Sequence, residues 1–226
     1  MSGFSQILRQ LDWSVPLQLL LQAVPALICI MVHEICHGAM AYALGDSTAK
    51  TQGRLSLNPL RHVDWMGLVM LLLFHIGWAK PVQVDIRNFR YPKRDMALTA
   101  LAGPASNFVL AAVFLFLYGA AYAPCMVRGY TWVLAILSST AYLSVSLGLF
   151  NLIPFPPLDG SKILFAFLPD RAYVRLMQLE RYGMIVLIAA VLLMSRVFQV
   201  SPVQQASEAV FQAMLPIAQW ASGLTA

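Results

Sequence analysis

The chain has 226 residues, of which 59% are hydrophobic and 11% are charged, and its mean hydropathy is +0.69. These values exclude an ordinary soluble domain and indicate a polytopic α-helical membrane protein, long enough for about four to six transmembrane helices. A formal net charge of +5 would suggest a nucleic-acid partner in a soluble protein, but here Lys and Arg gather in the loops, as the positive-inside rule expects. The composition therefore predicts a lipid bilayer around the chain and no nucleic acid.

The first apolar run carries three polar side chains of unusual spacing. Residues 15–44 predict a membrane span, and its first eighteen residues contain no charge before the motif HEICH begins at His33. Because His33 and His37 are four residues apart, they share one face of a helix, and two imidazoles placed in this way can bind one tetrahedral metal ion. Glu34 stands beside them, where a general base for metal-bound water is needed. A lone His on an apolar face is more often a core histidine, but ionisable groups at membrane depth cost several kcal/mol unless a partner such as a metal offsets them.

The next part of the chain predicts a surface element. Residues 46–65 are polar, and both TQGRLSL at 51–57 and the stretch 78–91 alternate apolar with polar side chains, so together they predict a small β-element at the membrane surface. The apolar run 66–78 between them is short for a span, and it is re-entrant, interfacial or a thin span. If this run does not cross, the eight basic residues of 45–95 place the β-element on the cytoplasmic side.

Two further spans are predicted at 96–118 and 131–153, and the second ends in a proline-rich break. The break reads NLIPFPPLDG at 151–160, and three prolines within four positions cannot continue a helix. At membrane depth such backbone is tolerated only where it is buried in protein or lines a wet cavity. Asp159 follows the break directly and is a candidate third ligand, since a catalytic zinc site usually has three protein ligands. A turn that caps a span is the commoner explanation of PPLDG alone.

The C-terminal part predicts one more span and an amphipathic tail. Residues 183–197 form the span, and the tail from 201 lies on the membrane or crosses it as a thin span at 205–222. No shift in composition divides the chain, so 1–226 is predicted to be a single membrane-embedded domain with its core at 15–165 and its C-terminal span and tail at 182–226.

Taken together, the motifs resemble the site-2 protease family of intramembrane zinc metalloproteases. HEICH together with PPLDG is a specific combination, whereas GPASN alone would be weak. The resemblance covers about residues 15–165 and is carried by HEICHG at 33–38, SLNPLRHVDWMG at 56–67, GWAKPVQV at 77–84, GPASN at 103–107 and NLIPFPPLDG at 151–160. Two of these stretches, 56–67 and 77–84, are similar to the small prokaryotic branch that lacks PDZ and CBS domains.

The resemblance implies a role for five residues. His33, His37 and Asp159 would bind one Zn²⁺ per chain. Glu34 would be the catalytic base, and Asn107 would stabilise the substrate or the transition state. The implied reaction is hydrolysis of peptide bonds within or near transmembrane segments of membrane-protein substrates. The implied location is a prokaryotic inner membrane, with the active site in the bilayer towards the cytoplasmic side.

Two other functions remain as alternatives. One is a metal carrier, which would need polar groups in several spans to form a path, whereas here they concentrate at one site. The other is an inactive scaffold of the same fold that binds membrane partners, and the presence of both Glu34 and Asp159 disfavours it. The sequence therefore favours the protease.

Overall fold

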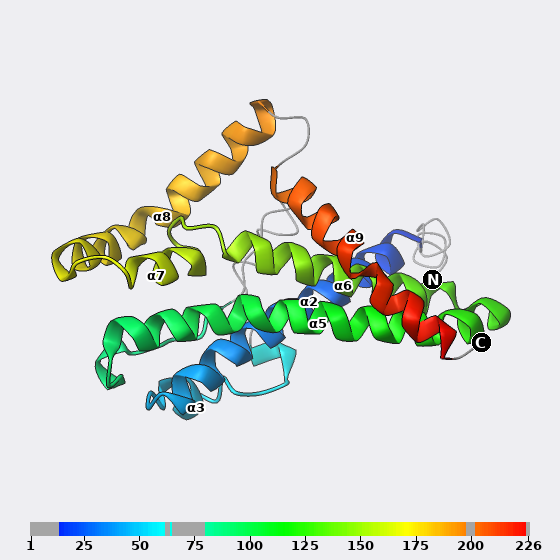
Figure 1. The fold of residues 1–226 in the computed structure, drawn as a ribbon, viewed down its shortest axis with the longest axis horizontal. Helices are drawn as coiled ribbons and strands as arrows, with labels where there is room; N and C mark the ends of the chain where they lie inside the picture. The colour runs from blue at the N-terminus through cyan, green and yellow to red at the C-terminus, as the bar shows by residue number, and fades with distance from the viewer. Residues whose placement is uncertain (1–13, 62–63, 65–79, 198–201, 225–226) are drawn as a thin grey trace, which may run out of the picture.

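The computed structural model describes residues 14–61, 64, 80–197 and 202–224, and this part of the chain is helical and contains no strand. Figure 1 shows long helices gathered around α5, with α7 and α8 towards one end of it and α9 towards the other. The elements are α2 (Ser14–Ala43), α3 (Thr48–Thr51), η1 (Pro59–Arg61), η2 (Ile86–Asn88), α5 (Pro92–Arg128), α6 (Thr131–Asn151), α7 (Asp159–Phe165), α8 (Asp170–Val197) and α9 (Pro202–Gly223).

Three helices of the described chain are long and apolar enough to cross a membrane: Ala23–Ala43 within α2, α5 and α6. They confirm the predicted spans at 15–44, 96–118 and 131–153. The middle helix is longer than predicted, at 37 residues, because Pro92 is tolerated in its first turn and the helix continues through Pro104 and Pro124 to Gly129. Gly129 ends α5 with φ +75°, a conformation that glycine adopts without steric cost.

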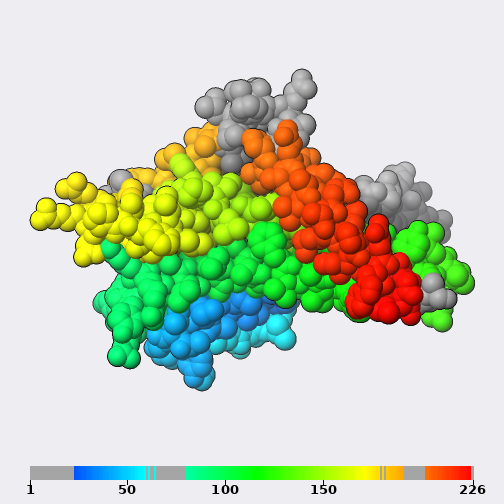
Figure 2. Space-filling view, viewed as in Figure 1, coloured from blue at the N-terminus to red at the C-terminus, as the bar shows by residue number. Residues whose placement is uncertain are grey.

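The long helices pack closely because small residues lie between them. In Figure 2, α9 covers part of the surface of α5 and α6. A Cβ atom added to Gly119 of α5 would clash with the carbonyl oxygen of Ala218 in α9, so the two backbones are almost in contact there. Leu115, Ala141 and Ala218 form a buried apolar cluster at this end of the bundle. Such close approach through small residues is typical of helix pairs in membranes.

The β-element predicted for 46–65 and 78–91 is not found in the described parts of these stretches. Residues 48–51 form α3, and residues 80–85 have no regular secondary structure, with Asp85 in an extended conformation just before the 3-10 turn η2. Side chains cap the backbone locally: Asp46 accepts a hydrogen bond from the Thr48 N–H, and Asp85 accepts one from the Arg87 N–H, each 3.0 Å long. Short polar side chains that bind nearby backbone in this way compete with a sheet ladder. The predicted apolar run 66–78 lies outside the described residues.

The C-terminal part also differs in detail from the prediction. One continuous helix, α8, includes both the polar residues after 170 and the described part of the predicted span at 183–197. The predicted amphipathic tail forms α9, which packs on the bundle rather than lying apart from it. Neither helix is among the three that are apolar enough to span, so the predicted number of four to six spans is not reached in the described chain.

Candidate metal centre

Two segments more than a hundred residues apart bring three ligand atoms together. His33 and His37 of α2 place their Nε2 atoms 2.9 Å apart, and each Nε2 lies 3.1 Å from Oδ2 of Asp159. All three residues are buried: His33 is 5% exposed, His37 is 8% exposed and Asp159 is 7% exposed. Among the described residues, this is the group of His, Cys, Asp or Glu whose atoms are close enough to hold a metal ion.

Asp159 reaches the histidines because the chain turns back sharply after α6. The helix ends at Asn151, the break follows, and Asp159 is the first residue of α7. A Cβ atom on Gly160 would clash with the carbonyl oxygens of Leu152 and Ile153. Only glycine therefore allows the first turn of α7 to pack against the end of α6, and this packing directs the preceding carboxylate into the bundle.

The second histidine is oriented by α5. Nδ1 of His37 donates a hydrogen bond of 2.7 Å to the carbonyl oxygen of Thr99. With its proton on Nδ1, the imidazole turns the lone pair of Nε2 towards Asp159, as a metal ligand requires. The α5 backbone can come this close because residue 103 is glycine, where a Cβ atom would clash with both imidazole rings.

Asn107 gives a test of whether a metal fits this site. Its side chain is completely buried, Nδ2 lies 3.0 Å from Nδ1 of His33, and Oδ1 has no partner within the described chain. A metal on Nε2 of His33 requires a proton on Nδ1, and that proton requires an acceptor. A rotation of the amide by 180° would bring Oδ1 to Nδ1–H and satisfy both atoms. The donor set and this unpartnered oxygen both fit a bound metal.

The carboxylate of Asp159 has different neighbours on its two oxygens. Oδ2 faces the imidazoles, whereas Oδ1 lies 3.9 Å from Nζ of Lys162, which is itself 3.6 Å from Oε1 of Glu180 in α8. Burial by itself would raise the pKa of the Asp159 carboxyl, but its hydrogen bonds with His33 and His37 outweigh burial and hold that pKa below its usual range. The group is therefore an ionised carboxylate, the form that binds a cation.

Glu34 lies beside this group and is not part of it. Its Oε2 accepts a hydrogen bond of 2.7 Å from the backbone N–H of Val82, in the segment before η2. The structure thus brings together four of the five predicted site residues, and it places the fifth next to them with a partner that sequence reasoning missed. A backbone N–H leaves no signal in the sequence, so no pattern could have identified Val82.

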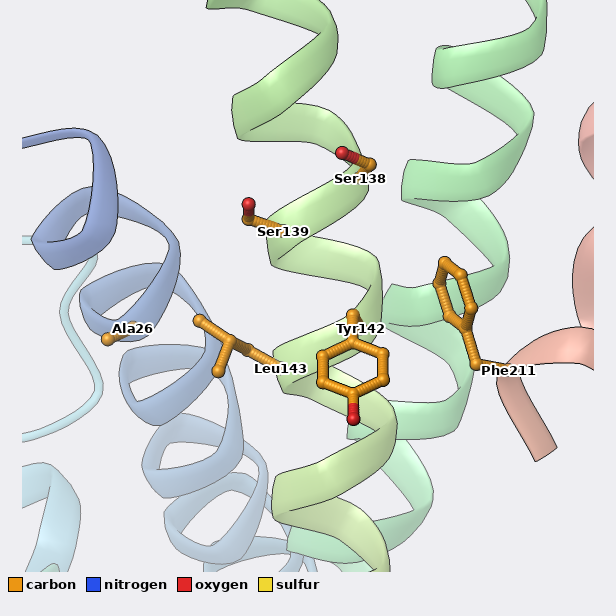
Figure 3. A pocket seen from close by; sticks show the side chains of 6 residues that line it. All are labelled: Ala26, Ser138, Ser139, Tyr142, Leu143 and Phe211. Carbon is orange, nitrogen blue, oxygen red and sulfur yellow. The ribbon is translucent and has the colours of Figure 1, made fainter. Parts of the chain in front are cut away.

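A separate apolar cavity of about 610 Å³ lies between α2, α6 and α9. In Figure 3 the rings of Tyr142 and Phe211 lie across it from Leu143 and Ala26. Its lining residues are Ala26, Ser138, Ser139, Tyr142, Leu143 and Phe211. None of these residues is a predicted metal ligand or base.

A protein of Bacillus subtilis named "Putative zinc metalloprotease YwhC" is 39% identical to this chain over 163 residues, which are 71% of this chain and 74% of that protein. The chain belongs to peptidase family M50. The model of that family matches residues 125–195, a stretch that contains Asp159. A protein of Mycolicibacterium smegmatis named "Putative zinc metalloprotease Rip2" is 30% identical over 166 residues, which are 72% of this chain and 62% of that protein. No solved structure matches the chain.

Membership of this family confirms the resemblance to site-2 proteases that the motifs predicted, and it makes the M50 chain a metallopeptidase by family. Together with its three apolar helices, it also makes the chain an integral membrane protein.

Proposed function

We propose that this M50 chain is an intramembrane zinc metalloprotease that hydrolyses peptide bonds within or near transmembrane segments of other membrane proteins. The observation that carries the proposal is the convergence of His33, His37 and Asp159 within 3.1 Å, next to a glutamate that is not a ligand. Two imidazole nitrogens and one carboxylate oxygen are typical zinc ligands, and three protein ligands leave a position open for water. One zinc ion per chain is expected.

The residues of the proposed site have separate roles in the reaction. Bound zinc would supply a Lewis acid and lower the pKa of its water towards neutrality. Glu34 accepts a proton from the attacking water and passes it to the leaving amine. Asn107 fixes the ring of His33 through a hydrogen bond, and we expect its amide to stabilise the substrate or the transition state next to the metal.

The substrate must expose its backbone before it can react. A peptide bond in a transmembrane helix is protected by its own hydrogen bonds, so the helix has to unwind locally. The segment 80–85, which has no regular secondary structure, would offer backbone groups with which an unwound strand can pair. A hollow of about 420 Å³ is lined by residues of this segment and of α3 and supports access there.

The distribution of charge supports an orientation in the membrane. Basic residues gather in 45–95 and 155–181, and by the positive-inside rule this supports a cytoplasmic side for these segments and for the ends of α2 and α7 that carry the proposed ligands. The membrane proposed is the inner membrane of a prokaryotic cell. The apolar later part of α8 would provide a fourth span.

The proposal is tested by measuring zinc content and cleavage of a reporter membrane helix by the wild type, Glu34→Gln and His33→Ala in the same detergent. We expect wild type and Glu34→Gln to bind one zinc ion, and Glu34→Gln to lose about a thousandfold in rate because the general base is gone. His33→Ala should lose both zinc and cleavage.

The same measurements separate the two alternatives. A metal carrier would bind zinc and cleave nothing, and a scaffold would show the same behaviour in the wild type and in Glu34→Gln. Either result would overturn the proposed hydrolysis.

A further inference from the structure

A second buried carboxylate lies outside the metal centre and has no part in the chemistry described above. Asp46 follows the end of α2 and is 0% exposed. Its Oδ1 accepts hydrogen bonds from Thr48 N at 3.0 Å, Thr48 Oγ1 at 2.5 Å and Asn88 Nδ2 at 2.7 Å. Its Oδ2 accepts one from the backbone N–H of Asp85 at 2.8 Å. A buried charge with four donors is costly to assemble unless it fixes something in place.

These hydrogen bonds tie the segment 80–88 to the end of α2. Oδ1 of Asp46 binds the start of α3 and the side chain of Asn88, whereas Oδ2 binds only the backbone of the segment itself at Asp85. A further hydrogen bond of 2.9 Å joins Gln52, at the end of α3, to Gln83. The segment is therefore held from two sides.

The same segment contacts the proposed general base. The N–H of Val82, three residues before Asp85, donates a hydrogen bond of 2.7 Å to Oε2 of Glu34. The Val82 side chain packs on α2 where residue 38 is glycine, since a Cβ atom there would lie 3.3 Å from Cγ1 of Val82. Glu34 thus lies on α2, and Asp46, just beyond the end of α2, holds the segment that contacts Glu34. The hydrogen bonds of Asp46 with Asp85 and Asn88 are called the clamp below.

We propose that Asp46 is a positioning residue: it fixes the segment 80–88 so that the Val82 N–H holds the Glu34 carboxylate in one orientation. This inference rests on the proposed hydrolysis. A general base acts well only when its reacting oxygen is held in place, and a displacement of about 1 Å at such a group can cost a hundredfold in rate. With the clamp released, the segment moves away and the carboxylate turns freely.

The first test compares Asp46→Asn with Asp170→Asn. An asparagine at 46 can keep the oxygen that faces Thr48 and Asn88, but its NH₂ group would then face the Asp85 N–H, so that one hydrogen bond is lost. Asp170→Asn makes the same chemical change at an exposed carboxylate of α8, outside the segment 80–88. We expect kcat at saturating substrate to fall between about tenfold and a hundredfold in Asp46→Asn, with zinc content as in the wild type, and no change in Asp170→Asn.

The second test does not depend on cleavage. Hydrogen exchange of peptides that cover 80–90 should be faster in Asp46→Asn than in the wild type, with α5 and α6 unchanged. Asn88→Ala removes a single donor to Oδ1 and should accelerate the same peptides less. If Asp46→Asn fails to fold, Asn88→Ala tests the clamp with the same measurements.

The outcomes separate this inference from the proposed function. Unchanged kcat or unchanged exchange in a folded Asp46→Asn would overturn the clamp, and so would loss of zinc in parallel with kcat, because the residue would then only support the fold. If the wild type itself cleaves nothing, the hydrolysis fails, and the role of positioning a base fails with it. Faster exchange at 80–90 would then show the clamp as a purely structural contact.

Discussion

The two halves of α5 are buried in different ways. Towards its start, Thr99, Gly103 and Asn107 contact the imidazoles of α2, and burial there is polar, with hydrogen bonds that join the Thr99 carbonyl and the Asn107 amide to the two rings. Towards its end, Leu115 and Gly119 pack against α9, and burial is apolar and close. Each half has one glycine that allows close approach: Gly103 to the imidazole rings of α2, and Gly119 to the backbone of α9.

The difference shows how one helix can serve chemistry and stability without conflict. Buried polar groups contribute little to stability even when they are satisfied, so the start of α5 needs a separate source of stability. Packing of small residues against α9 provides it, some distance from the metal ligands. Changes at the first end should therefore alter metal binding and rate, and changes at the second should alter stability.

The largest effect is expected from Asp159→Ala. Removal of one of three ligands should weaken zinc binding by more than about a hundredfold and abolish cleavage, while the apolar packing of α9 stays intact. Zinc titration and the reporter assay measure the two losses. Asp170→Asn, at an exposed carboxylate of α8 paired with Lys93, is the control and should bind zinc as the wild type does. Full zinc affinity in Asp159→Ala would contradict the proposed ligand set.

The comparison of the two glycines gives the next largest effect. Gly103→Ala forces a methyl group into both imidazoles and should lower zinc affinity with little change in the packing of α9. Gly119→Ala forces a methyl group against the Ala218 carbonyl and should lower stability by about 1–3 kcal/mol with zinc affinity retained. Thermal unfolding and zinc titration distinguish them. Gly223→Ala, where a Cβ atom meets nothing within 4 Å, is the control.

If Gly119→Ala lost zinc as completely as Gly103→Ala, the two ends of α5 would be coupled. The expected division of α5 into an end that affects zinc binding and an end that affects stability would then be wrong.

A smaller effect is expected from Glu180→Gln. Without Glu180, the charge of Lys162 near Asp159 is no longer neutralised and competes with the metal for the carboxylate. Zinc affinity should fall by about tenfold, and Lys162→Met added to Glu180→Gln should restore it. Zinc competition assays at one pH and ionic strength measure this cycle. A double variant as weak as Glu180→Gln would show that Lys162 does not mediate the effect.

The smallest effect is a dependence of stability on pH at Asp46. Burial would raise the pKa of this carboxyl, but hydrogen bonds from Thr48, Asn88 and Asp85 hold it below its ordinary value. Its contribution to stability is therefore complete above about pH 5 and is lost as the pH falls through the lowered pKa. The difference in Tm between the wild type and Asp46→Asn should be largest near pH 7 and shrink towards pH 3. A difference that stays constant with pH would contradict this.

Much of the helical architecture could be predicted from the sequence because spans depend on local composition. The apolar runs gave α2, α5 and α6, although Pro92 and the late stop at Gly129 made α5 longer than predicted. The β-element was wrong in the described residues, since alternation alone ignores side chains such as Asp46 and Asp85 that cap the backbone locally. The sequence predicted a span only at 183–197, whereas α8 begins at Asp170. The first turns of α8 are polar, so hydropathy did not identify them as part of the same helix.

The candidate site was predicted in parts. The spacing of His33 and His37 places them on one face of any helix, so their proximity follows from the sequence alone. Asp159 could be named as a candidate from the break before it and from the family resemblance, and its role as a ligand stays a prediction. The clamp at Asp46 and the pairing of Val82 with Glu34 had no sequence signal, because they join backbone groups to side chains more than thirty residues away.

The amino-acid sequence by itself determined three long apolar helices that suit a bilayer and the pair of imidazoles that shares a helical face, because hydropathy and helical period act over a few neighbouring residues. The tertiary structure alone decided that Asp159 meets those imidazoles, that Asn107 and Thr99 orient them, and that the segment before η2 holds Glu34. These contacts depend on how closely separate helices approach, and that distance is set by glycines whose role appears only when the partner backbone is in place.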